Sequence, residues 1–189
     1  MKRKIFFCAL ITGIIAVLSV GTAAYFTTDG TAVNVITAGS VKIELLETVL
    51  KDGETEKIPF ENIISIVPDT SVSKIVTVKN TGKSPEYVRV SVKKEILLSD
   101  GAVPENASSL IETDFNTEYW TEHDGYWYYN KILESGQETE PLFTKAVFAK
   151  EMKNIYQDSK ALIDIKAFGV QSDNNGGSPT EAVGWSDNK

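Results

Sequence analysis

Apolar and polar side chains alternate along several stretches of this chain, which is the spacing of half-buried strands. In residues 41–45 and 88–92 every second side chain is apolar and the ones between are charged or polar. Residues 75–78 are β-branched throughout, and residues 163–170 form a further apolar-rich run of this kind. Residues 126–129 are aromatic on both faces. These residue types pack well on a pleated surface, so each stretch is predicted to be a strand.

Short turn-forming sequences separate the predicted strands. They are Asp52-Gly53, Asn80-Thr81-Gly82, Asp100-Gly101, Asp124-Gly125 and Ser135-Gly136. Each supplies residues that tolerate turn dihedrals. Many short strands divided in this way predict an all-β protein with an antiparallel β-sandwich fold.

Three segments depart from the alternation. Residues 95–118 predict a long connection with one short helix, capped by Ser108 or Ser109. Residues 149–156 predict one or two helical turns. Residues 173–189 are rich in Asn, Gly and Ser and are expected to form a flexible tail. Trp185 lies in that tail, where we interpret it as pinning the tail to the domain rather than binding a ligand.

The first residues have the three parts of a secretory signal peptide. Residues 2–4 are basic, residues 5–20 are almost wholly apolar, and residues 22–24 are small. The apolar run is slightly short for a membrane span, which takes roughly 20 residues. We therefore expect a signal peptide over residues 1–25, cut after Ala24 or after Tyr25. A retained N-terminal anchor is the alternative.

Charge and cysteine content narrow the function classes. The net charge is −7, and removal of residues 2–4 makes the remainder more negative. An acidic surface disfavours nucleic acid and anionic lipid as partners. Cys8 is the only cysteine and leaves with the signal peptide, so we expect no disulfide in the secreted form. Stability must then come from the core of one domain, placed at residues 26–172.

A search for catalytic chemistry predicts no enzyme, no cofactor and no metal site. His123 is the only histidine, whereas a zinc protease needs a second one a helical turn away. Calcium bound by turn carboxylates such as Asp52, Asp100 and Asp124 is an open alternative, although no loop has the regular acidic spacing of a dedicated site. The chain also lacks a Gly-x-Ser-x-Gly nucleophile motif.

A block of aromatic residues flanks the turn at His123 to Gly125. Its members are Tyr119, Trp120, Tyr126, Trp127, Tyr128 and Tyr129. In a hairpin they would either fill the core and stack across strands or line a face that binds sugars. We favour the first interpretation. The second predicts an exposed Trp120 or Trp127 and a monomeric polysaccharide-binding or surface-binding module.

Several motifs together resemble a known family of exported proteins. The sequences Gly21-Thr22-Ala23-Ala24-Tyr25-Phe26-Thr27 and Thr37-Ala38-Gly39-Ser40-Val41-Lys42-Ile43 resemble the start of TasA and camelysin-type biofilm matrix proteins. The clostridial BsaA branch is most similar, through Val78-Lys79-Asn80-Thr81-Gly82, Pro85-Glu86-Tyr87-Val88-Arg89-Val90 and Asp124-Gly125-Tyr126-Trp127-Tyr128-Tyr129-Asn130-Lys131. The resemblance covers nearly the whole chain.

The resemblance implies a secreted structural subunit of biofilm fibres or pili with a jelly-roll-like β-sandwich. Export would use a dedicated signal peptidase, SipW, and the family pattern places the cut just before Phe26. Some camelysin relatives are grouped as metallopeptidases, but the single histidine does not support that activity here. Because no Leu-Pro-x-Thr-Gly motif is present, attachment to the cell would need a minor fibre or anchoring protein.

The resemblance also implies polymerisation by donor-strand exchange, in which the freed N-terminal strand of one subunit completes a sheet of the next. Residues 26–38 would be this donor strand, with Phe26, Val33, Val35 and Ile36 as its apolar residues. An open sheet edge presents unpaired backbone groups that an added strand satisfies. The result would be a head-to-tail homopolymer whose mature subunits are not embedded in a membrane.

Overall fold

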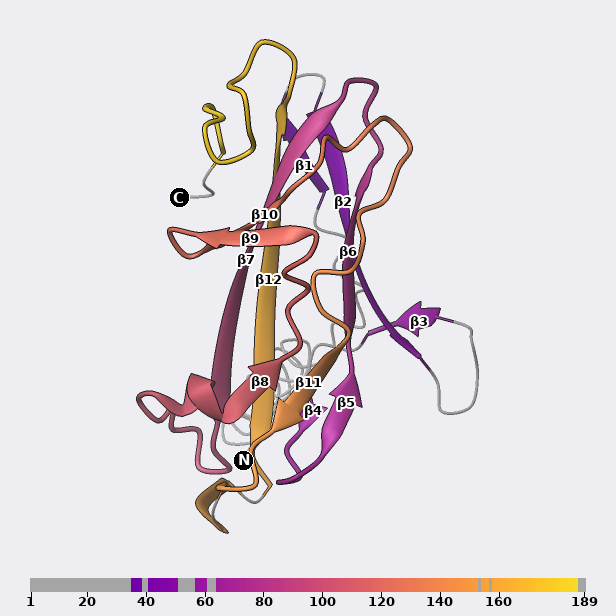
Figure 1. The fold of residues 1–189 in the computed structure, drawn as a ribbon. Helices are drawn as coiled ribbons and strands as arrows, with labels where there is room; N and C mark the ends of the chain where they lie inside the picture. The colour runs from indigo at the N-terminus through magenta and orange to yellow at the C-terminus, as the bar shows by residue number, and fades with distance from the viewer. Residues whose placement is uncertain are drawn as a thin grey trace, which may run out of the picture. The chain divides into compact units, whose positions relative to one another are not determined.

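The structure is a computed structural model that describes residues 35–38, 41–50, 57–60, 64–152, 154–156 and 158–186. The chain divides into two compact units, residues 1–32 and residues 33–189. The predicted signal peptide and its cleavage residues Ala24, Tyr25 and Phe26 lie outside the described residues. All that follows concerns the second unit (Figure 1).

Strands make up most of the described chain, and two short 3-10 helices lie in connections. The strands are β1 (Val35–Ala38), β2 (Val41–Leu50), β3 (Lys57–Pro59), β4 (Ile64–Ser65), β5 (Ser71–Ser73), β6 (Ile75–Asn80), β7 (Glu86–Leu97), β8 (Ile111–Thr113), β9 (Trp120–His123), β10 (Tyr126–Tyr129), β11 (Lys145–Phe148) and β12 (Lys160–Gln171). The 3-10 helices are η1 (Ala107–Leu110) and η2 (Asn154–Tyr156).

One layer of the fold is a five-stranded antiparallel sheet in the order β4-β12-β7-β10-β9. Its two long strands, β7 and β12, pair along their whole length, from Glu86 opposite Gln171 to Leu97 opposite Lys160. β10 pairs with β7 only at Arg89 and Val90, and β4 pairs with β12 only at its first two residues. The β7–β12 pair is therefore the backbone of this layer.

The second layer combines two smaller antiparallel sheets. In one, β2 pairs with β1, β3 and β6, and in the other the order is β5-β11-β8. Residues 137–144 join them, because the N–H of Leu142 donates to the carbonyl oxygen of Val76 (2.8 Å) and that of Val76 to Phe143 (3.2 Å). The predicted all-β sandwich of antiparallel sheets is thereby confirmed, while the jelly-roll order of connections stays a prediction.

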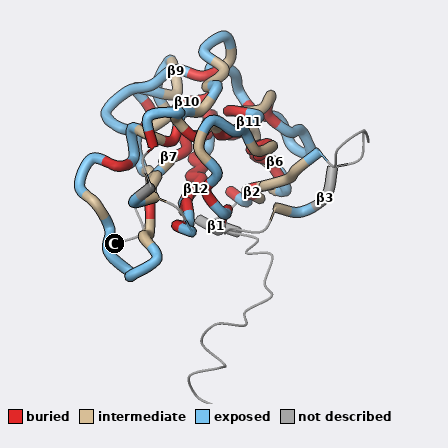
Figure 2. Tube along the Cα trace, turned by 90° about the horizontal axis from the view of Figure 1, so that it is seen from below, coloured by how far each residue is buried: buried red, intermediate tan, exposed pale blue. Residues whose placement is uncertain are grey.

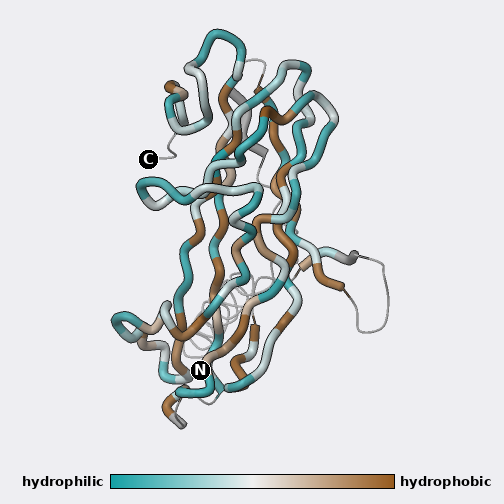
Figure 3. Tube along the Cα trace, in the orientation of Figure 1, coloured by the Kyte–Doolittle hydropathy of each residue, from teal (hydrophilic) through white to brown (hydrophobic). Residues whose placement is uncertain are grey.

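The hydrophobic core lies between the two layers, where the buried positions of facing strands meet (Figure 2). Val41, Ile43 and Leu45 on β2 are buried while Lys42 is exposed, as the alternation predicts. Hydrophobic residues concentrate along the strands and hydrophilic ones along the turns (Figure 3). The first of the two predicted helices is η1, but Asn106 precedes it with φ 61° and no side chain caps it, so the capping role predicted for Ser108 or Ser109 is wrong.

Candidate functional site

The predicted donor strand ends in β1, which is an edge strand of its own subunit. β1 pairs with the start of β2, from Val35 opposite Glu44 to Ala38 opposite Val41. Sheet order places β1 at the end of its sheet, with β2 as its partner. Val35 and Ile36 therefore lie in β1, whereas Phe26 and Val33 lie outside the described residues.

β12 has the longest strand edge without a strand partner in the described part of the chain. β4 covers only Lys160 and Ala161, and positions 162–171 pair on one side alone, with β7. The N–H of Ser172 donates to Pro85 beside β7, whereas Ser159 accepts from Ile66 beside β4. Since backbone groups alternate sides along a strand, the odd-numbered residues of β12 present theirs to the outer edge.

A buried carboxyl ties the start of β2 to β7. Glu86 has no exposed surface, and its Oε1 accepts a hydrogen bond of 3.0 Å from the N–H of Lys42. Its backbone N–H and C=O pair with Leu133. Its Oε2 lies 3.0 Å from where a Cβ on Gly169 would stand and has no hydrogen-bond partner. One glutamate thus links the layer that holds the N-terminal hairpin to β7 in the other layer, next to β12.

The titration of Glu86 predicts a pH dependence of stability. Burial raises the pKa of the Glu86 carboxyl, and the hydrogen bond from Lys42 only partly opposes this. A folded-state pKa above the ordinary 4.5 stabilises the fold at pH values below 4.5, and that contribution is lost as pH rises toward the folded pKa. We expect Glu86→Gln to remove this loss, because a neutral amide oxygen still accepts from Lys42.

The measurement is the free energy of unfolding by urea for both proteins at a series of pH values from about 4 to about 8. The wild type should lose stability relative to Glu86→Gln as pH rises. Other carboxyls cancel in this difference, including Asp114 and Glu140, whose lowered pKa values act in the opposite direction. Parallel stability curves for the two proteins would contradict the prediction.

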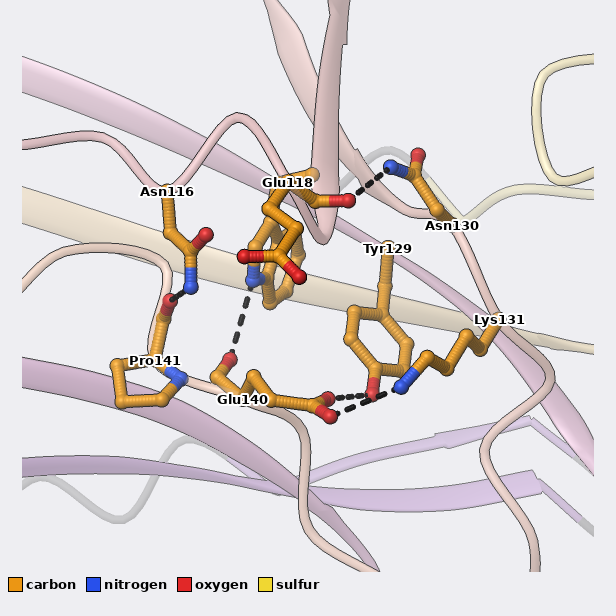
Figure 4. Close-up of polar contacts among 8 residues, drawn as sticks. Asn116, Glu118, Tyr129, Asn130, Lys131, Glu140 and Pro141 are labelled. Atoms are coloured by element: carbon orange, nitrogen blue, oxygen red, sulfur yellow. Dashed lines mark hydrogen bonds and ion pairs between the residues drawn. The ribbon is translucent and has the colours of Figure 1, made fainter.

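The aromatic block forms the β9–β10 hairpin and its contacts with residues 115–119 and 140–141. Trp120 is 1% exposed, and its Nε1–H donates to the carbonyl oxygen of Glu140 (3.0 Å). The carboxylate of Glu140 accepts hydrogen bonds from the Tyr129 hydroxyl and from Lys131 Nζ (Figure 4). Burial raises the pKa of Tyr129, so its hydroxyl remains a donor. Trp127 is half-buried and stacks on Phe115 at 4.1 Å between ring centroids. The core interpretation therefore accounts for both tryptophans, and the sugar-binding interpretation loses the exposed Trp120 that it expected.

The C-terminal segment packs on the outer face of β7, β10 and β12. The Trp185 ring lies 4.7 Å from the guanidinium carbon of Arg89, which also lies over the Tyr126 ring at 3.9 Å. Arg89 donates to the Tyr128 hydroxyl (3.2 Å), and Ala182 is buried beside Tyr87 and Val170.

Asn175 holds the segment in this position. Its side-chain amide donates to the carbonyl oxygens of Gln171 and Val183, and its Oδ1 accepts from the N–H of Val183. Composition led us to expect a flexible tail from residue 173, but the described part, to Ser186, is packed and hydrogen-bonded. Trp185 contacts the domain as its pinning interpretation expects.

His123 lies in the exposed β9–β10 turn, with its Nε2 3.3 Å from a carboxylate oxygen of Asp124. In the described ranges, no three His, Cys, Asp or Glu side chains group as a metal site would require. Within the same ranges no helix is long and apolar enough to cross a membrane.

Sequence reasoning did not find Glu86 or the open edge of β12. A charged residue at the start of a strand reads as exposed, and an edge depends on pairing partners far away in sequence. Gly169 was the one available signal, since a glycine inside a strand often marks close approach of another segment. No protein-family model matches the chain, no curated protein matches it, and no solved structure matches it.

Proposed function

We propose that this chain is a secreted structural subunit of an extracellular matrix fibre or pilus, assembled by donor-strand exchange of residues 26–38. The supporting observation is the place of β1. It is an edge strand near the start of the compact unit, directly after the segment that the predicted cleavage frees. Four residue pairs join it to β2, so pairing with its own subunit is limited.

The energetics favour exchange over self-pairing when the arm buries more surface on a neighbour. Burying three or four apolar side chains is worth on the order of 5–10 kcal/mol gross. Association and ordering costs remove much of this. A head-to-tail contact of this kind does not close on itself, so it produces an open filament.

The proposal includes the route and the partners implied by the resemblance. A dedicated signal peptidase would cut before the arm and so release it, and the subunits would then polymerise outside the cell. A minor fibre or anchoring protein would attach the fibre to the cell surface. The acidic charge supports a role that involves neither nucleic acid nor anionic membrane surfaces.

The test compares protein that begins at Phe26 with protein lacking residues 26–38. We expect filaments of the first under negative-stain electron microscopy, and a monomer of the second by sedimentation. A second variant, Val33→Ser with Ile36→Ser, keeps the length of the arm but removes apolar surface, and should polymerise far more slowly. Tryptophan fluorescence checks that each variant is folded, since Trp120 is buried. Equal polymerisation of the full and the truncated protein would rule out the donor-strand mechanism.

A further inference from the structure

We propose that the outer edge of β12, at positions 162–171, is the surface that receives the N-terminal arm of a second copy of this chain. This inference rests on the proposed function, which requires an acceptor but does not say where it lies. The edges of both layers, the backbone direction of β12 and the charge of its exposed side chains lead to this assignment.

The competing strand edges are short or already lined by the chain itself. β8 and β9 end their sheets but contain only Ile111–Thr113 and Trp120–His123. β7 is unpaired by β10 beyond Val90, but there residues 103–108 form the other wall of a pocket of about 420 Å³ along Val92–Ile96. A loop that covers an edge is a common protection against strand addition. The long edge of β12 has no such cover among the described residues.

The backbone of β12 is oriented to pair with a guest strand. The odd-numbered residues Ile163, Ile165 and Ala167 direct their N–H and C=O groups away from β7, by the alternation that Ser159 and Ser172 fix at its two ends. Their side chains are buried in the core. A strand added here would gain backbone hydrogen bonds without disturbing the pairing of β12 with β7.

The length and the charge of the arm fit this edge. Residues 26–34 precede β1 and span about 30 Å when extended, and positions 162–171 of β12 span about 33 Å. The exposed side chains of the edge, Asp164 and Lys166, carry opposite charges, so the edge is neutral on an otherwise acidic chain. Asp29 is the only charged residue of the arm, and the edge does not repel it.

The edge also lies on the side of the sandwich from which the arm leaves. β12 contacts both β1 and β2. At Gly169 the contact with β2 is so close that an added Cβ would stand 3.1 Å from the side chains of Val41 and Ile43. The start of one arm and the acceptor edge are therefore neighbours in each subunit, as a repeating head-to-tail contact through a single side requires.

Disulfide trapping tests the assignment directly, because Cys8 is the only cysteine and is absent from protein that begins at Phe26. One set of proteins carries a single cysteine in the arm, at Thr31, Ala32, Val33 or Asn34. The other carries Lys166→Cys. Each arm protein is mixed with the edge protein, allowed to polymerise and oxidised. A disulfide forms only where the two Cα atoms lie within about 7 Å, so several arm positions sample the unknown register.

The matched control is Lys145→Cys, which is also an exposed lysine on a strand. β11 pairs on both sides, with β5 and β8, so its backbone has no free edge. We expect a covalent dimer with Lys166→Cys for at least one arm position and none with Lys145→Cys. Filaments that yield no dimer with Lys166→Cys at any arm position would overturn the acceptor assignment but leave the proposed function intact. Failure of the cysteine-free protein to polymerise would overturn both.

A second variant blocks the edge instead of marking it. Ala167→Pro removes an N–H that faces away from β7, so no hydrogen bond within the domain is lost, but a guest strand can no longer pair there. Lys166→Ala changes only an exposed side chain and is its control. With both variants folded by tryptophan fluorescence, only Ala167→Pro should lose filaments. Normal filaments of a folded Ala167→Pro protein would contradict the inference.

Discussion

Replacing Glu47 by alanine is expected to lower the free energy of unfolding by about 3–5 kcal/mol, the cost of leaving a buried charge without its partner. The charge in question is Lys74, which is completely buried just before β6. Its Nζ pairs with the carboxylate of Glu47 on β2 and lies 3.6 Å from the centroid of the Phe60 ring. Burial lowers the pKa of Lys74, and Glu47 opposes that shift. Without Glu47 the ammonium group keeps only the ring as a partner.

Urea unfolding followed by tryptophan fluorescence measures this cost. The informative control is the double variant Lys74→Met with Glu47→Leu, which replaces the ion pair by apolar side chains of similar volume. Such replacements are often neutral or stabilising, so the double variant should be much more stable than Glu47→Ala alone. A loss below about 1 kcal/mol for Glu47→Ala, as for a surface pair, would contradict the prediction.

Truncation of Trp120 to alanine is expected to cost about 3–5 kcal/mol, as for other large core side chains. Trp120 is among the largest fully buried side chains, and its ring lies 5.1 Å from that of Tyr129. The substitution also removes the indole N–H that donates to Glu140. It therefore combines a cavity with a lost hydrogen bond at the base of the β9–β10 hairpin.

Two further variants separate these causes, with thermal and urea unfolding as the measurement. Trp120→Phe keeps an aromatic ring but loses the N–H, so it should cost clearly less than Trp120→Ala. Trp185→Ala removes an indole that is only partly buried and packs outside the main core, so we expect a loss near 1 kcal/mol. An equal loss at Trp120 and Trp185 would show that burial does not determine the effect.

The strands and their buried faces could be predicted from the sequence because each depends on a local pattern. The alternation at residues 41–45 and 88–92 reports which side chains face the core, and the structure places them accordingly. The turns were equally local, since Gly101, Gly125 and Gly136 all adopt the positive φ that glycine tolerates. The packing of Trp185 followed from its being a large apolar residue in a polar segment.

The buried charges and the open edges could not be predicted, because both depend on partners distant in sequence. Lys74 and Glu86 are charged residues next to strands, and their burial follows from Glu47 and from the hairpin that begins at Val41. The edge of β12 is open because β4 is short, a property of a different segment. The capping of η1 was wrong for a local reason, since Asn106 adopts φ 61° and its carbonyl, not its side chain, accepts from Ser109.

The alternation along β12 has a consequence for the accuracy of any assembly that uses its edge. Only every second residue offers its backbone outward, so a guest strand can shift along β12 only by two residues at a time, which is about 6.6 Å. A shift of a single residue would turn all its side chains to the opposite face. Errors in subunit spacing would therefore be discrete, and the axial repeat of a fibre would take a few separate values instead of a continuous spread.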